Sequence, residues 1–312
     1  SEAGRVRLTA TTNVNSFGFW QSPANFVPAI QGALFRAEFN VSTSSTDPNL
    51  TPQARLRVNS STNEVAHYLV IGSPNGGRYS PNTAGKNYDL IFESPGSGRT
   101  GNEDAFSISF DLINFDPTDP ATGDLALESI EIRRTDKSSL VVNATPSNFT
   151  FAAGTEGWTY LGGDVIGFSA ATSGTPAGAL SLSATNNVNN VGFWFSPAAA
   201  TLDATSRLYR ATFNVNSDQA NTAVVPSVRF RINSNDNETG VEQWAFAQLI
   251  GTASPGTTPR DYNTYFLSSP AGSGSALAIA MDLISFDTRV APAATITLNN
   301  AKLEELAIPT FN

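Results

Sequence analysis

Hydrophobic and polar positions alternate one by one along many short stretches of the chain. Ala37, Phe39 and Val41 alternate with polar neighbours, and residues 106–112 repeat this pattern. A period of two is typical of strands with one buried face. Clusters of Gly, Pro and Asn, such as SPNGG at 73–77, separate these stretches. No stretch has helical periodicity, so the pattern predicts an all-β protein.

The chain also repeats itself at an offset of 174 residues. Residues 8–23 align with residues 182–197, and 11 of these 16 positions are identical. The same offset aligns further blocks without a gap: 34–41 with 208–215, and 55–64 with 229–238. Repetition at a fixed offset indicates duplicated domains. We therefore predict two tandem β-sandwich domains of jelly-roll type, 1–140 and 141–312.

The second repeat begins with a segment that the first does not have. Residues 148–177 precede the aligned region, and they contain Phe149 and Phe151 at strand spacing, followed by a turn and Trp158. The first repeat starts at the position that matches Thr175. We therefore expect the first sandwich to lack its opening strand. Either an upstream segment has been removed, the first repeat closes differently, or a strand from another subunit completes it.

A donor for such a strand is present at the C-terminal end. The candidate donor tail extends past the last aligned strand and, like residues 145–151, has Pro shortly before Phe. Its residues are Leu306, Ala307, Ile308, Pro309, Thr310 and Phe311. Donation from one subunit to the next is a head-to-tail contact, which produces rings or filaments.

Composition restricts the class of protein. Charged residues make up 14% of the chain, the net charge is −9, and only three lysines occur. No basic run is present, so a nucleic-acid partner is not expected. No apolar run is long enough to span a membrane. Cysteine is absent and the only methionine is internal. Together with the Asn-, Ser- and Thr-rich composition, these features favour an extracellular or cell-surface protein.

The sequence contains few of the residues and motifs that catalysis needs. His67 is the only histidine and has no counterpart in the second repeat, and no nucleophile or phosphate-loop motif occurs. We therefore expect a protein that is not an enzyme and has no cofactor. Asp116, Asp119 and Asp124 cluster in one turn, and carboxylates grouped in this way are candidate calcium ligands. Polar turns often have this composition without binding a metal.

Each repeat carries a set of Trp, Arg and Asp that alternation assigns to the outer side of its sheets. This follows if the Phe side chains of the GFW motif face the core. The residues are Trp20, Arg36, Arg55, Arg57 and Asp111, and Trp194, Arg210, Arg229, Arg231 and Asp282. Such a set suits a glycan, because sugar rings stack on indole and hydroxyls bind Arg and Asp. It equally suits an internal Arg–Asp and Arg–Trp lattice, or a contact between domains or subunits.

The opening of the second repeat resembles that of bacterial jelly-roll carbohydrate-binding modules. The resemblance rests on the strand at 149–151, the turn at Gly154, and the pair Gly157–Trp158, followed by a β-rich body. It covers the second repeat only, and it implies the fold and a polysaccharide partner.

These observations lead to two functional hypotheses. The first is an extracellular structural subunit of a filament, sheath or surface layer that assembles with itself. The alternative is a tandem carbohydrate-binding module of a larger secreted protein. Whether the purified chain polymerises distinguishes the two hypotheses.

Overall fold

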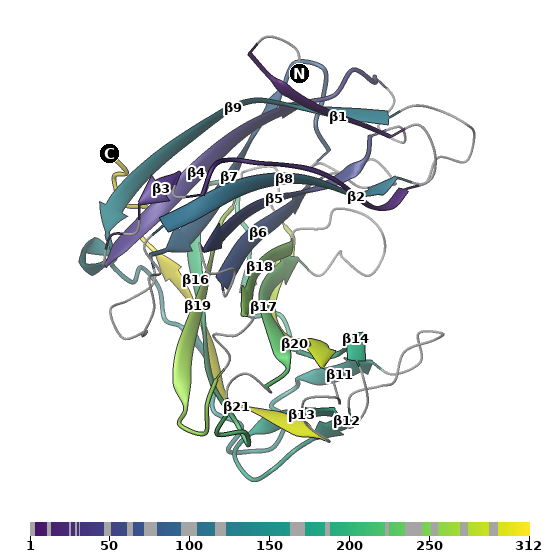
Figure 1. The fold of residues 1–312 in the computed structure, drawn as a ribbon. Coiled ribbons are helices and arrows are strands. Elements are labelled where there is room, and N and C mark those ends of the chain that lie inside the picture. The colour runs from purple at the N-terminus through teal and green to yellow at the C-terminus, as the bar shows by residue number, and fades with distance from the viewer. Residues whose placement is uncertain are drawn as a thin grey trace.

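The chain is described by a computed structural model that contains β-strands and one short 3-10 helix, η2 (Lys137–Ser139), and no α-helix in its described part. The described residues are 4–10, 14–24, 26–28, 30, 32–46, 51–60, 65–71, 80–94, 105–115, 123–162, 172–184, 188–221, 225–234, 245–250, 255–268, 274–286 and 293–312. The all-β prediction is confirmed (Figure 1).

Strands β1 to β9 belong to the first repeat and β10 to β21 to the second. The first set is β1 (Val6–Ala10), β2 (Val14–Gln21), β3 (Val27–Pro28), β4 (Ala33–Ser42), β5 (Gln53–Ser60), β6 (Val65–Ile71), β7 (Lys86–Glu93), β8 (Ala105–Phe115) and β9 (Gly123–Asp136). The second set is β10 (Ser147–Phe149), β11 (Thr159–Gly162), β12 (Thr172–Gly174), β13 (Leu180–Ala184), β14 (Val188–Phe195), β15 (Ala200–Thr201), β16 (Leu208–Ser217), β17 (Ser227–Ser234), β18 (Ala245–Ile250), β19 (Arg260–Leu267), β20 (Ala276–Phe286) and β21 (Ala294–Leu306).

Three sheets contain all of these strands. A four-stranded sheet has the order β1-β9-β4-β7, and a six-stranded sheet has the order β12-β13-β21-β16-β19 with β10 beside β21. The third, which we call the central sheet, has eleven strands in the order β11-β14-β20-β17-β18-β6-β5-β8-β2, with β3 and β15 paired to it. Each half of the central sheet faces one smaller sheet, so each repeat is a β-sandwich, as predicted.

The central sheet runs through both repeats because β6 pairs with β18. We call this pairing the joint. It is antiparallel, and Tyr68 lies opposite Ala247. Tyr68 also pairs with Arg57 in the first repeat, while Ala247 pairs with Arg231 in the second. Arg57 and Arg231 are equivalent at the offset of 174. Tyr68 and Ala247 are therefore equivalent too, and the repeats meet about a pseudo-two-fold axis at this pair.

A partly buried polar cluster connects the two repeats through the smaller sheets. Glu93 at the end of β7 accepts hydrogen bonds from Tyr265 and from Asn263 Nδ2, the latter at 3.1 Å. Its other oxygen is 2.6 Å from Lys137 Nζ. Tyr265 is completely buried. The Glu93 carboxylate of the first repeat is thus held by side chains of the second repeat.

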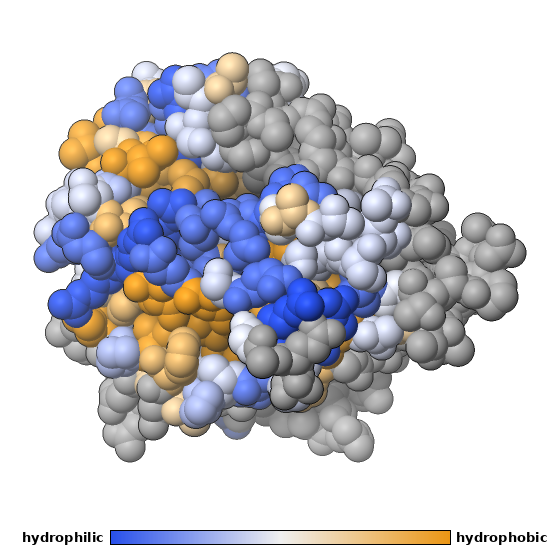
Figure 2. Space-filling model, turned by 90° about the horizontal axis from the view of Figure 1, so that it is seen from above, coloured by the Kyte–Doolittle hydropathy of each residue, from blue (hydrophilic) through white to orange (hydrophobic). Residues whose placement is uncertain are grey.

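The core consists mainly of aromatic and aliphatic residues from the inner faces. In the first repeat Phe92 stacks on Phe35 at 5.3 Å between ring centroids, and in the second Phe230 stacks on Phe213 at 4.7 Å. One connected cluster of buried hydrophobic residues extends through both repeats. The surface seen from above shows hydrophobic areas on both sides of a hydrophilic band (Figure 2).

The first repeat lacks more of the opening segment than the sequence predicts. In the second repeat β10 pairs with β21, β11 with β14, and β12 with β13. Within the described residues, the first repeat has no counterpart of any of these three strands. The sequence predicted the absence of one strand, because only Phe149 and Phe151 showed strand alternation.

The candidate donor tail lies against its own chain. Leu306 ends β21, and Ala307 donates from its N–H to Val141 O at 2.8 Å. Asn312 then exchanges two backbone hydrogen bonds with Arg134 of β9, at 2.9 and 3.0 Å, and Phe311 packs against the core. The tail therefore contacts the first repeat within one molecule, and its donation to another subunit stays a prediction.

Candidate functional site

The outer face of the central sheet carries two equivalent sets of arginine and aspartate, one on each side of the joint. We call this surface the arginine face. Its residues are Arg55, Arg57 and Asp111 in the first repeat and Arg229, Arg231 and Asp282 in the second. Alternation places them outward, because Leu56 and Phe230 between the arginines are completely buried in the core.

In each set a buried carboxylate lies between two guanidinium groups. Asp111 is 2% exposed and is 2.8 Å from Arg55 Nη2 and 3.4 Å from Arg57 Nε. Asp282 is equally buried, accepts a short hydrogen bond from Arg229, and is 2.8 Å from Arg231 Nε. A buried carboxylate requires such partners, because desolvation of an unpaired charge is costly. The arginines are thereby fixed in position on the sheet.

The environment changes the basicity of these arginines in different directions. Burial lowers the pKa of Arg57, even though Asp111 favours its charged form. Burial also disfavours charge on Arg229, but Asp282 and Tyr68 outweigh it and raise the pKa of Arg229. Arginine stays protonated in both cases. The face therefore presents fixed positive groups with hydrogen-bond donors.

Tyr68 connects the two sets across the joint. Arg55 lies over its ring at 5.4 Å from the centroid, and Arg229 Nη1 donates to its hydroxyl at 3.4 Å. The ring is 5% exposed. The repeat pattern in the sequence does not point to Tyr68, because the second repeat has alanine at the equivalent position.

The assignment of Trp20 and Trp194 to this face is wrong. Trp194 pairs with Met281, whose side chain is in the core, and Trp194 is itself 4% exposed. Trp20 pairs in the same way with Phe110. The residues on the arginine face are instead Phe19 and Phe193, which pair with Asp111 and Asp282. In the GFW motif both neighbours are aromatic, so alternation alone cannot show which of them faces the core.

Phe193 and Phe19 differ in what covers them. Arg231 lies over the Phe193 ring, 4.7 Å from its centroid, whereas Phe19 is 57% exposed. The arginine face therefore has an accessible aromatic ring in the first repeat and a cation-covered one in the second.

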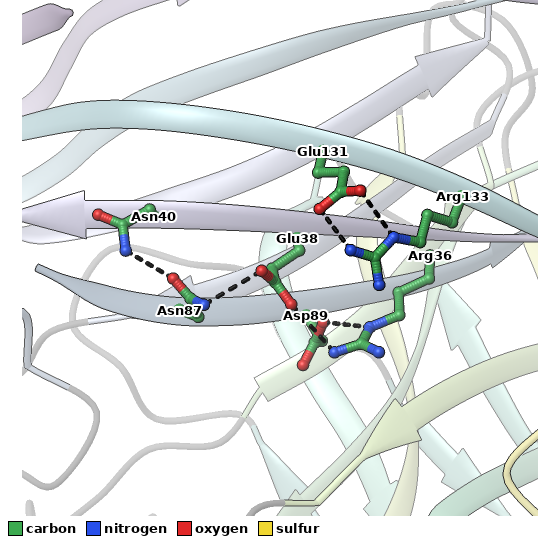
Figure 3. Close-up of polar contacts among 7 residues, drawn as sticks. All are labelled: Arg36, Glu38, Asn40, Asn87, Asp89, Glu131 and Arg133. Atoms are coloured by element: carbon green, nitrogen blue, oxygen red, sulfur yellow. Dashed lines mark hydrogen bonds and ion pairs between the residues drawn. The ribbon is translucent and has the colours of Figure 1, made fainter. Parts of the chain in front are cut away.

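Arg36 and Arg210 lie on the opposite side of the sandwiches. Arg36 is on β4, and its Nε donates to Asp89 at 2.6 Å (Figure 3). Arg210 is on β16, and its Nη2 is 2.8 Å from Glu304. Both arginines point outward as predicted, but from the smaller sheets, so they do not share a surface with Arg55. Sequence alternation indicates inside and outside, but not which sheet a strand joins.

Figure 3 also shows that the outer face of the four-stranded sheet pairs its polar groups with each other. Asn87 donates to Glu38 at 3.1 Å, and Arg133 makes two hydrogen bonds to Glu131, at 2.7 and 2.6 Å. These groups satisfy one another on the surface, which is typical of a solvated sheet face.

The calcium candidates are only partly within the described residues. Asp116 and Asp119 lie outside them. Asp124 is 5% exposed, pairs with Arg7, and accepts a hydrogen bond from the Ser44 N–H at 3.0 Å. Its carboxylate is thus occupied by protein groups. No group of three metal-ligating side chains occurs in the described part of the chain.

No helix within the described ranges has the length and hydropathy that a membrane span needs. No protein-family model and no curated protein matches the chain.

Solved structures that match the chain include carbohydrate-binding modules, the class that the opening of the second repeat resembles. A CBM4 module is 21% identical with a TM-score of 0.35, and the match covers 50% of this chain and 99% of the module. A cellulose-binding domain of a Cellulomonas fimi β-1,4-glucanase is 18% identical with a TM-score of 0.32, covering 52% and 94%. A tandem CBM22-1–CBM22-2 domain from Paenibacillus barcinonensis is 10% identical with a TM-score of 0.31, covering 97% and 92%.

Proposed function

We propose that this chain is a non-catalytic, extracellular protein that binds an extended polysaccharide across its arginine face. The observation that supports the proposal is the continuity of the central sheet. Because β6 pairs with β18, both Arg–Asp sets lie on one face of one sheet. Arg57 and Arg231 lie in line across the joint, three strand spacings or about 14 Å apart.

The chemistry of the face fits a hydroxyl-rich ligand. Each guanidinium has five N–H donors, whereas one carboxylate accepts about four hydrogen bonds. Two arginines around Asp111 thus have more donors than that carboxylate accepts, and Arg55 retains 26% side-chain exposure. Phe19 supplies an apolar ring beside them on which a sugar can stack. The face contains positive groups fixed in position, so binding would order few side chains.

Affinity electrophoresis in gels that contain soluble xylan or a soluble cellulose derivative tests this proposal. We expect the native chain to be retarded by at least one of them. The double variant Arg55→Gln, Arg229→Gln should lose the retardation, because it removes one donor group from each set. The variant Arg133→Gln is the control, because this arginine is on the four-stranded sheet and pairs with Glu131. Equal mobility of the native chain in both gels and in plain gels would contradict the proposal.

Assembly with other copies of the chain is the second candidate function. It is favoured by the tail, which pairs with β9 through its last residue only and leaves Ile308 46% exposed. A short contact of this kind can form between molecules as well as within one. Negative-stain microscopy of the native chain and of a chain without residues 308–312 tests it: polymers that depend on the tail are expected, and unchanged assembly would exclude tail donation.

A further inference from the structure

The two Arg–Asp sets of the arginine face contain the same residue types but differ in how these pair. In the second set, Asp282 is held closely by both arginines. Arg229 donates a short hydrogen bond to it from Nε, and Arg231 approaches it with Nε and with Nη2, each at 2.8 Å. The two nitrogens of Arg231 reach different carboxylate oxygens, which is the bidentate geometry of a strong guanidinium–carboxylate pair.

In the first set, Asp111 is held closely by Arg55 only. Arg55 reaches the carboxylate with Nε at 2.9 Å and with Nη2 at 2.8 Å. Arg57 is farther away, with Nε at 3.4 Å and Nη2 at 3.5 Å, the outer limit of a hydrogen bond. Its Nε is buried and has no hydrogen-bond partner among the described residues. Arg57 is therefore paired much less tightly than its equivalent Arg231.

This difference lies in the interior of the central sheet. Arg57 is on β5, which has β8 on one side and β6 on the other, and Arg231 is on β17, between β20 and β18. The two arginines thus occupy equivalent places in the same arrangement of strands. The side chain of Arg57 retains 23% exposure, against 13% for Arg231. The more weakly paired guanidinium is also the more accessible one.

The positive charge of Arg57 is only partly compensated. Burial lowers the pKa of Arg57, and the attraction of Asp111 does not restore it, since the neighbouring Arg55 acts in the same direction as burial. A lowered pKa of a basic group means that its charged form is less stable there than in water. Because arginine stays protonated, a further anion beside Arg57 would stabilise it.

Positive charge is also in excess over the central sheet as a whole. The Asp, Glu, Lys and Arg residues in its eleven strands are the four arginines and two aspartates of the arginine face. The chain itself has a net charge of −9. A positive surface on an acidic protein attracts anionic ligands to that surface and repels them elsewhere.

We propose that Arg57 binds a carboxylate of the ligand, so that the arginine face prefers polysaccharides that contain acidic sugars. This inference rests on the proposed function and specifies its class of ligand. The planar guanidinium matches a carboxylate and binds it through two hydrogen bonds, whereas a sugar hydroxyl supplies no charge. Arg231 already makes this contact with Asp282, so the first set is the one that selects the acidic group.

Two soluble cellulose derivatives with the same backbone test the preference. Carboxymethylcellulose carries carboxylates, and hydroxyethylcellulose is neutral. In calorimetric titrations at low salt, we expect the native chain to bind carboxymethylcellulose at least about tenfold more tightly, which is the factor that one charge-assisted hydrogen bond supplies. The preference should decrease as salt is raised from about 0.01 to about 1 M, because salt screens accessible charges.

Variants with native circular dichroism locate the preference. Arg57→Gln should bring the affinity for carboxymethylcellulose close to that for hydroxyethylcellulose. Arg57→Lys should keep part of the preference, because the charge remains while the planar fork is lost. Arg231→Gln should reduce the preference less than Arg57→Gln does. Arg133→Gln is the control outside the arginine face and should bind both polymers like the native chain.

The outcomes separate this inference from the function on which it rests. Equal affinity of the native chain for the two derivatives would overturn the inference and leave polysaccharide binding intact. A preference that Arg57→Gln does not reduce would also overturn it. Absence of binding to both derivatives and to xylan would contradict the proposed function, and the inference with it.

Discussion

Glu93 of the first repeat accepts a hydrogen bond from the hydroxyl of Tyr265 in the second repeat. Tyr265 has no exposed surface, and Glu93 is also held by Lys137. This contact and the joint make the two repeats one structural unit, so disturbance of either should affect the whole chain.

Alkaline pH should destabilise the fold through buried tyrosines. Burial raises the pKa of Tyr265, and Glu93 raises it further; burial also raises the pKa of Tyr209 to about 12. In the unfolded chain both phenols ionise near pH 10. Stability is therefore complete below about pH 10 and falls above it by up to about 1.4 kcal/mol per pH unit for each tyrosine. Urea unfolding between pH 8 and 11 measures this, and Tyr265→Phe should have a shallower decline. Parallel declines would contradict the prediction.

Replacement of Tyr68 should weaken the joint. Tyr68→Ala removes a buried ring that contacts both repeats and should lower the free energy of unfolding by about 3 to 5 kcal/mol. Tyr68→Phe retains the ring and loses only the hydrogen bond from Arg229, which contributes about 1 kcal/mol. Chemical denaturation measures both values. A loss below 1 kcal/mol for Tyr68→Ala would show that the ring does not stabilise the joint.

The ion pairs of the buried Asp111 and the exposed ion pair of Asp203 should differ in their contribution to the free energy of unfolding. Asp111→Asn leaves two arginines without a charged partner at a buried site and should cost about 3 kcal/mol. Asp203→Asn is the matched control, because Asp203 pairs with Arg207 at a side-chain exposure of 48% and its loss should lower stability far less. Thermal unfolding of the two variants provides the comparison. Equal losses would mean that the arginine face is as solvated as the surface pair.

Removal of the tail should be detectable at a single amide. The Arg134 N–H donates to Asn312 O at 3.0 Å, and Arg134 itself is exposed. A chain that ends at Ile308 should exchange the Arg134 amide hydrogen faster, while the amides of β16, inside the six-stranded sheet, should not change. Hydrogen exchange followed by NMR tests this. Unchanged exchange at Arg134 would show that the tail contact does not persist in solution.

Part of this structure could be predicted from the sequence. The period of two and the gap-free repeat are local properties, and they predicted strands, two sandwiches and the buried Phe39 and Val41. The partner of a strand is not a local property. Nothing in the chain near Arg36 shows that β4 joins a different sheet from β5, and nothing near Tyr68 shows that β6 pairs with β18. For the same reason the face of Trp20 was assigned wrongly, because both sides of that strand are aromatic.

The joint has a consequence for how the two halves can diverge. In a dimer of identical chains, a residue on the two-fold axis faces its own copy, so its size and polarity are matched on both sides. Covalent linkage of the halves removes that restriction. Here a large ring, Tyr68, faces a small residue, Ala247. The two positions can thus differ in size, and a bond such as that from Arg229 to Tyr68 can cross the axis in one direction only.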